Sequence, residues 1–82
     1  MTGNGLFSFV INGKRYSSYE RLRSYVTVAG MAGFSLHESP VITYYSSLDG
    51  EFPFKLPRSG VVMQLPDEVI TFFVRRREEV KV

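Results

Sequence analysis

Val69-Ile-Thr-Phe-Phe-Val74 is the most apolar run in the sequence, and it decides the fold. A run with no charge and one hydroxyl suits a strand that is covered on both faces, in the middle of a sheet. Its ends are abrupt, because the turn residues Pro66-Asp67-Glu68 precede it and Arg75-Arg76-Arg77 follows it. The comparable run, Leu6 to Ile11, comes from the opposite end of the chain, so we expect the two to be neighbouring strands.

The composition describes one small domain that packing alone must hold together. The chain has 82 residues, seven Phe, five Tyr and no cysteine, which excludes disulfides and thiolate metal sites. No apolar stretch approaches the roughly 20 residues of a membrane-spanning helix, and the first residues do not resemble a secretory signal. We therefore expect a cytoplasmic protein without membrane contact. The formal net charge of +2 permits nucleic-acid binding without demanding it.

The chain is expected to open with a hairpin. Residues 1–5 are predicted to be flexible, residues 6–77 to form the domain, and residues 78–82 to be a tail. After the apolar strand Leu6 to Ile11, Asn12-Gly13 suits the positive φ angles of a two-residue turn. A second strand is predicted from Lys14 to about Leu22, and its mixed polarity is typical of a sheet edge.

One helix follows, and the sequence offers two starting points for it. Ser17 and Glu20 have the spacing of a capping box, which would start the helix at Ser18. We favour a later start, with Ser24 as the N-cap of a helix from Tyr25 to Ala32.

The later helix has a predicted buried stripe and a predicted end. The stripe consists of Val28, Met31 and Ala32. Gly33 would end the helix, and Phe34 would anchor it to the sheet. An internal glycine, Gly30, weakens the helix and suggests a close approach of helix to sheet.

The second half of the chain alternates short strands and turns. Ser35 to Pro40 is predicted as a loop and Val41 to Tyr45 as a strand, closed by a turn at Asp49-Gly50. Phe52 to Leu56 is predicted as a short edge strand because it contains a proline and precedes another. Val61 to Leu65 is interpreted as an apolar connection.

This order of elements predicts the architecture. One helix must cover one face of a mixed sheet of four to five strands, in which the first and last strands lie side by side and parallel. The predicted class is α+β, and the predicted architecture is the β-grasp.

Four segments, two of which overlap, resemble ubiquitin-like proteins, and the resemblance spans Leu6 to Arg77. The run from Val69 to Arg77 resembles the last strand and basic tail of ubiquitin. The other segments are similar to the bacterial multi-ubiquitin family: the opening Phe9-Val-Ile-Asn-Gly-Lys-Arg-Tyr16, the helix end Ala32-Gly33-Phe34, and Val62-Met-Gln-Leu-Pro-Asp-Glu-Val-Ile-Thr-Phe-Phe-Val74.

The resemblance implies a protein modifier or a non-covalent protein-interaction module, bacterial or phage-borne. Its expected partners are an activating or conjugating enzyme or a deconjugating metalloprotease. Modifiers of this kind are attached through a C-terminal glycine, whereas no glycine lies beyond Gly60 and Glu78-Glu79 stands near the expected position. Three interpretations stay open: a unit of a longer protein, processing to another terminus, or non-covalent binding alone.

The candidate partner-binding residues follow from strand alternation and from the resemblance. If the helix covers Ile70, Phe72 and Val74, then Thr71 and Phe73 lie on the open face with alternate residues of the neighbouring strand. The resemblance places a recognition patch on that face and adds the basic tail. The predicted set is Thr43, Tyr45, Thr71, Phe73, Arg75, Arg76 and Arg77. The alternative is that a loop or a second copy of the chain covers Phe73.

Little in the sequence indicates catalysis. His37 is the one histidine, so neither a metal site nor a catalytic dyad is expected, and we predict neither a cofactor nor an enzyme. The alternative function is single-stranded nucleic-acid binding, with tyrosines that stack on bases and basic residues that contact phosphates. Its residues would be Tyr16, Tyr19, Tyr44 and Tyr45 with Lys14, Arg15, Arg21 and Arg23. Ordinary sheet packing also explains these tyrosines, and nucleic acid is therefore the less favoured partner.

Overall fold

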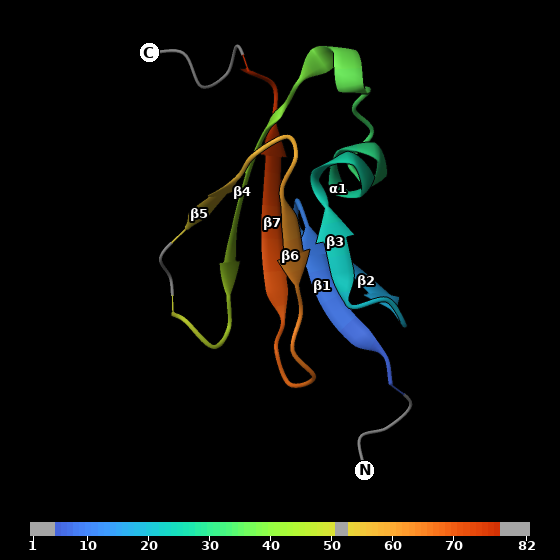
Figure 1. The fold of residues 1–82 in the computed structure, drawn as a ribbon, viewed down its shortest axis with the longest axis vertical. Coiled ribbons are helices and arrows are strands. Elements are labelled where there is room, and N and C mark those ends of the chain that lie inside the picture. The colour runs from blue at the N-terminus through green and yellow to red at the C-terminus, as the bar shows by residue number, and fades with distance from the viewer. Residues whose placement is uncertain (1–4, 51–52, 78–82) are drawn as a thin grey trace.

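The computed structural model describes residues 5–50 and 53–77 and has the predicted α+β architecture. A mixed sheet of five strands in the order β2-β1-β7-β4-β5 carries one helix on one face, as in a β-grasp (Figure 1). The elements are β1 (Phe7–Ile11), β2 (Lys14–Ser18), β3 (Leu22–Ser24), α1 (Tyr25–Met31), the 3₁₀ helix η1 (Leu36–Glu38), β4 (Val41–Ser46), β5 (Phe54–Leu56), β6 (Val61–Met63) and β7 (Ile70–Arg75). The predicted flexible residues 1–4 and the predicted tail 78–82 lie outside the described residues.

The two most apolar strands form the centre of the sheet, as predicted. β1 runs parallel to β7, with Phe9 opposite Ile70 and Ile11 opposite Phe72. β2 and β5 are the two edges, so the predicted edge positions are confirmed. β5 begins at Phe54, and Phe52, the predicted start of that strand, lies outside the described residues. Apolar residues therefore occupy the strands that have neighbours on both sides.

Asn12 has two roles at the end of β1. Its φ of 50° and that of Gly13, 85°, form the predicted tight turn between β1 and β2. The Asn12 side chain also donates to the carbonyl of Val74 (3.1 Å) and accepts from the Val74 amide (2.9 Å). The side chain thus extends the pairing of β1 with β7 by two hydrogen bonds.

The later start of the helix is confirmed, and the start at Ser18 is wrong. Ser24 has an extended backbone, and its hydroxyl accepts a hydrogen bond from the Thr27 amide at 3.1 Å. The chain before it does not continue as one long strand to Leu22. β2 ends at Ser18, and a separate three-residue strand, β3, leads directly into the helix.

The predicted buried stripe of the helix is partly wrong. Tyr25, Val28 and Ala29 are buried, whereas Met31 is 38% exposed and Ala32 is half-buried against the core. The stripe starts at the first helical residue, Tyr25, whose buried hydroxyl donates to the Pro40 carbonyl. Gly33, with a φ of 88°, ends the helix as predicted, and Phe34 packs against the core.

Gly30 does not mark a close approach of helix to sheet. It is exposed, and apart from its chain neighbours and the backbone of its own helix, no heavy atom would lie within 4 Å of a Cβ built on it. We expect Gly30→Ala to raise the free energy of unfolding by about 0.5–1 kcal/mol, since alanine restricts the unfolded chain and suits a helix. The matched substitution Gly33→Ala should act in the opposite direction because of its positive φ. Urea denaturation of both variants checks this, and a loss of stability in Gly30→Ala would contradict it.

The segment predicted as an apolar connection contains a strand. β6 pairs antiparallel with β3, with Leu22 opposite Met63 and Ser24 opposite Val61, and the two strands form a separate ribbon. Figure 1 shows this ribbon and α1 on the same side of the five-stranded sheet. Val62 is the ribbon residue that joins the apolar core. The helix therefore covers this face together with the β3–β6 ribbon.

A buried polar network lies beneath the ribbon. Arg23 is 2% exposed, its guanidinium lies 4.1 Å from the centre of the Phe9 ring, and it donates to the Gln64 side chain at 3.1 Å. Gln64 is fully buried and donates in turn to the carbonyls of Ser8 (2.6 Å) and Glu68 (2.7 Å). One side chain thus connects β1, β3 and the chain before β7.

Two charged side chains of this region are buried in different ways. The pKa of Arg23 is lowered by burial of its guanidinium, an effect that the nearby Glu20 carboxylate partly opposes. The Glu68 carboxylate accepts from the Ser46 hydroxyl and from the Leu65 amide, so it caps the turn that leads into β7. Backbone and neutral side-chain groups thus form the hydrogen bonds of both charges.

Among the described residues, no helix is long and apolar enough to cross a membrane.

Candidate partner-binding surface

The face of the sheet opposite α1 carries the predicted strand residues together. Ile70, Phe72 and Val74 are buried under the helix, so Thr71, Phe73 and Arg75 alternate onto the other face. Antiparallel pairing of β4 with β7 places Thr43 opposite Phe73 and Tyr45 opposite Thr71. Two pairs of residues from segments distant in the sequence thus form one continuous surface, which we call the open face (Thr43, Tyr45, Thr71 and Phe73).

An aromatic pair lies at the centre of the open face. The rings of Tyr45 and Phe73 are stacked, with centroids 5.9 Å apart and planes 23° from parallel. Phe73 remains 40% exposed, and Tyr45 is half-buried. A large apolar ring that is held in place and still reaches solvent is suited to contact a protein partner.

A shallow depression of about 480 Å³ adjoins the aromatic pair. Asn12, Thr43, Phe73 and Arg75 line it. The Asn12 side chain is fixed by its two hydrogen bonds to Val74, whereas Arg75 is exposed. The depression therefore combines a rigid polar wall, an aromatic wall and one cation.

The three consecutive arginines do not act as one cluster. Arg75 belongs to the depression on the open face, and Arg77 lines a different pocket, where β4 begins and β5 ends. Arg76 is exposed and belongs to neither group of lining residues. Strand alternation ends at Arg75, so the sequence pattern did not determine where Arg76 and Arg77 would point.

The residues of the nucleic-acid alternative do not share a surface. Tyr16 stacks on Phe9, and Tyr44 packs against Phe72 on the helix side of the sheet, whereas Tyr45 faces the opposite side. The prediction of Arg23 as a phosphate contact is wrong, because its guanidinium is buried against Phe9. Tyr19 alone of these tyrosines is strongly exposed, at 72%.

A second apolar surface was missed by the sequence analysis. Leu22, Val61 and Met63 lie on the outer side of the β3–β6 ribbon and are each more than half exposed. The signal for this surface is the alternation of exposed Val61 and Met63 with buried Val62. A strand of three residues is too short for such an alternation to be distinctive. The ribbon surface is therefore the comparison against which any role of the open face has to be tested.

Among the described residues, no three His, Cys, Asp or Glu side chains gather in a way that could hold a metal ion. His37 is exposed in η1, beside a glutamate whose carboxylate accepts from the Ser35 amide at 2.7 Å. That carboxylate completes a capping box for η1, which is a structural role.

Comparisons of the chain with protein-family models, with curated proteins and with solved structures found no match.

Proposed function

We propose that this chain is a ubiquitin-like protein-interaction module that binds its partner through the open face. The observation that carries the proposal is the stacked Tyr45–Phe73 pair, which is exposed on a sheet face that α1 does not cover. The β-grasp topology, with β1 parallel to β7 at the sheet centre, supports the likeness to ubiquitin-like proteins. The resemblance of the sequence segments supports it further, and it suggests action inside a bacterial cell.

The geometry favours protein contact for a physical reason. Burying a stacked aromatic pair removes a large apolar area from water at little cost in side-chain entropy, because the two rings already fix each other. Protein interfaces usually have an apolar centre and a polar rim. The Tyr45–Phe73 pair would form the centre, and Arg75, which lines the depression beside it, would belong to the rim.

The covalent version of the function is part of the same proposal. An activating enzyme would join a terminal carboxylate to AMP with release of pyrophosphate from ATP, and an enzyme cysteine would displace the AMP to form a thioester. A lysine amine of the target would then displace that cysteine and form an isopeptide bond. ATP-dependent adducts in a lysate of the source organism, detected with an antibody against the chain, would support attachment. Partner binding without adducts would leave the non-covalent version alone.

Phe73→Ala is the substitution that tests the open face. We expect it to weaken partner binding roughly ten-fold or more, as for a central aromatic contact, while the free energy of unfolding falls by only about 1 kcal/mol. The loss of stability is small because the ring is partly exposed and stacks on one neighbour. Quantitative mass spectrometry of proteins retained from the lysate, together with urea denaturation, measures both quantities.

Met63→Ala is the matched control on the other side of the molecule. Met63 is 59% exposed on the β3–β6 ribbon, so it tests whether any exposed apolar residue has the same effect. Proteins that are lost with Phe73→Ala and kept with Met63→Ala are partners of the open face. Loss with Met63→Ala alone would assign binding to the ribbon and contradict the proposal.

A further inference from the structure

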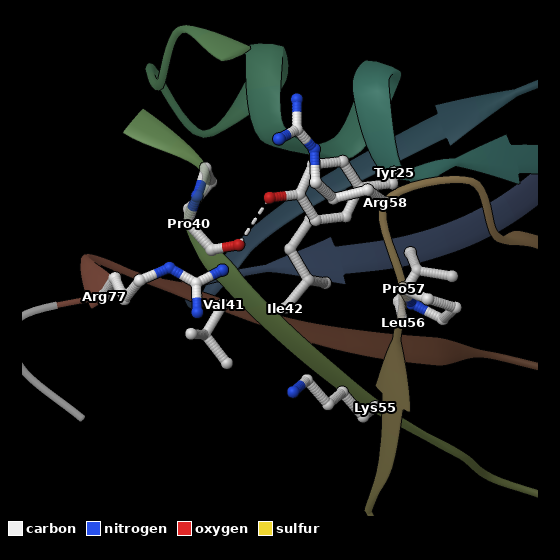
Figure 2. A pocket seen from close by; sticks show the side chains of 9 residues that line it. All are labelled: Tyr25, Pro40, Val41, Ile42, Lys55, Leu56, Pro57, Arg58 and Arg77. Carbon is white, nitrogen blue, oxygen red and sulfur yellow. Dashed lines mark hydrogen bonds between the residues drawn. The ribbon is translucent and has the colours of Figure 1, made fainter. Parts of the chain in front are cut away.

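A pocket where β4 begins and β5 ends is lined by three cations and by apolar side chains. It encloses about 230 Å³, and Lys55, Arg58 and Arg77 line it together with Val41, Ile42 and Pro57. Figure 2 shows Arg58 above Tyr25, Arg77 beside Pro40 and Val41, and Lys55 on the strand below. We call it the basic pocket, defined by Lys55, Arg58 and Arg77.

Among the described residues, no carboxylate lines the basic pocket. Glu38, on the neighbouring η1, accepts hydrogen bonds from the Ser35 amide and hydroxyl and is engaged in capping. Three like charges around one concave surface raise the local concentration of anions, because low-dielectric walls focus their field. The chain as a whole carries a net charge of only +2, so this concentration of cations is local.

The walls of the basic pocket are held in place by specific contacts. The buried Tyr25 hydroxyl donates to the Pro40 carbonyl at 2.5 Å, and the Tyr25 amide donates to the Gly60 carbonyl at 3.2 Å. Gly60 packs so tightly that a Cβ there would lie 2.8 Å from Cδ1 of Leu56. The helix start, the end of β5 and the following turn are therefore joined into one rigid frame.

Arg58 is oriented by a residue with a left-handed backbone. Its Nη1 donates to the Ser39 hydroxyl at 3.1 Å, and Ser39 has a left-handed φ of 43°, which is uncommon for a residue other than glycine. Ser39 is the C-cap of η1, where a left-handed residue is common. The hydrogen bond to Ser39 holds the Arg58 guanidinium at the rim of the basic pocket, above Tyr25 (Figure 2).

The spacing of the cations indicates the chemistry of the ligand. Lys55, Arg58 and Arg77 come from three different segments, and apolar side chains lie between them. Their donor groups therefore lie around an apolar surface and do not converge on a single point. A compact anion such as phosphate is bound best by donors that converge on it. An extended ligand with separated negative charges and an apolar group between them fits this arrangement better.

We propose that the basic pocket binds a short acidic peptide segment of a partner protein. Carboxylates of the peptide pair with Lys55, Arg58 and Arg77, and an apolar side chain between them contacts Val41 and Ile42. This site goes beyond the proposed function, because its lining residues do not include the Tyr45–Phe73 pair. It would bind its ligand even if the open face bound nothing.

A charge-reversal experiment with a matched control tests the basic pocket. The probe is a short fluorescent peptide in which glutamate alternates with valine, titrated by anisotropy against the full chain at low salt. We expect Lys55→Glu with Arg77→Glu to weaken binding roughly ten-fold or more, since both cations are lost. The control, Lys14→Glu with Arg15→Glu, changes net charge equally on β2 at the far edge of the sheet, and it should retain affinity within about two-fold.

Further measurements distinguish an acidic peptide from other ligands and test whether the variants are folded. The same peptide with glutamine for glutamate should bind far more weakly, and Phe73→Ala should leave binding of the acidic peptide unchanged. Lys55→Gln with Arg77→Gln repeats the test with less electrostatic repulsion, and circular dichroism reports the fold. The proposal would be overturned if the native chain did not bind the peptide, or if the control pair lost as much affinity as the pocket pair. It would also be overturned if inorganic phosphate displaced the peptide at a concentration lower than that of the peptide.

Discussion

Gln64→Leu is expected to lower the free energy of unfolding by about 2–4 kcal/mol, although leucine is similar in size and more apolar. The Gln64 side chain is fully buried and donates to the carbonyls of Ser8 and Glu68, while its oxygen accepts from Arg23. Leucine would leave the carbonyls of Ser8 and Glu68 without this donor, and a buried unsatisfied group costs about 1–3 kcal/mol. Arg23 would keep its hydrogen bonds to the carbonyls of Glu20 and Leu22. Urea denaturation at equal m-value measures the loss.

A double-mutant cycle connects this loss to the network. Arg23→Met alone removes the charge and leaves the Gln64 oxygen without its donor, so Arg23→Met with Gln64→Leu should cost less than the sum of the two single changes. Met63→Leu on the neighbouring exposed position should change stability by less than about 0.5 kcal/mol. Additive effects of Arg23 and Gln64 would contradict the coupling.

Phe72→Ala is expected to lower the free energy of unfolding by about 3–5 kcal/mol, which would leave little folded protein in a domain of this size. Phe72 is fully buried at the centre of the sheet. The centroid of its ring lies 6.4 Å from that of Phe9, which it contacts edge-on, and 5.8 Å from that of Tyr44. Truncation would open a cavity among rings that cannot collapse into it, because the surrounding strands fix them.

The neighbouring residue gives the control for Phe72. Phe73→Ala also removes a phenyl ring from β7, but from the opposite face of the sheet. We expect it to lower the free energy of unfolding by about 1 kcal/mol. Phe72→Leu should lower the free energy of unfolding by about 1–2 kcal/mol, so this variant should stay folded and can be measured. Similar losses for Phe72→Ala and Phe73→Ala would show that both faces of β7 are covered, which would also remove the basis for the open face.

The central strands and the helix start could be predicted because each depends on local patterns. The run from Val69 to Val74 is apolar enough to require two neighbours, and Asn12-Gly13 determines the turn through its backbone angles. Ser24 combines an N-cap side chain with a following apolar helix. In these places the local sequence preference and the tertiary structure agree.

The β3–β6 ribbon and the polar network could not be predicted in the same way. Strands of three residues are too short for their alternation to stand out, so the sequence predicts a connection from Val61 to Leu65 where the structure has β6. The sequence predicts a surface cation at Arg23, because burial of its guanidinium depends on a ring from β1 and an amide from a distant segment. The sequence also groups Arg77 with Arg75, although the two line different pockets.

The position of β7 at the centre of the sheet has a consequence for biosynthesis. β7 lies between β1 and β4, yet it is the last described strand to leave the ribosome. Until translation has passed it, the hairpin β1–β2 and the pair β4–β5 share no neighbour and each presents an unpaired edge. The nascent chain is therefore expected to stay open to chaperones and proteases for most of its synthesis, and to close in one late step.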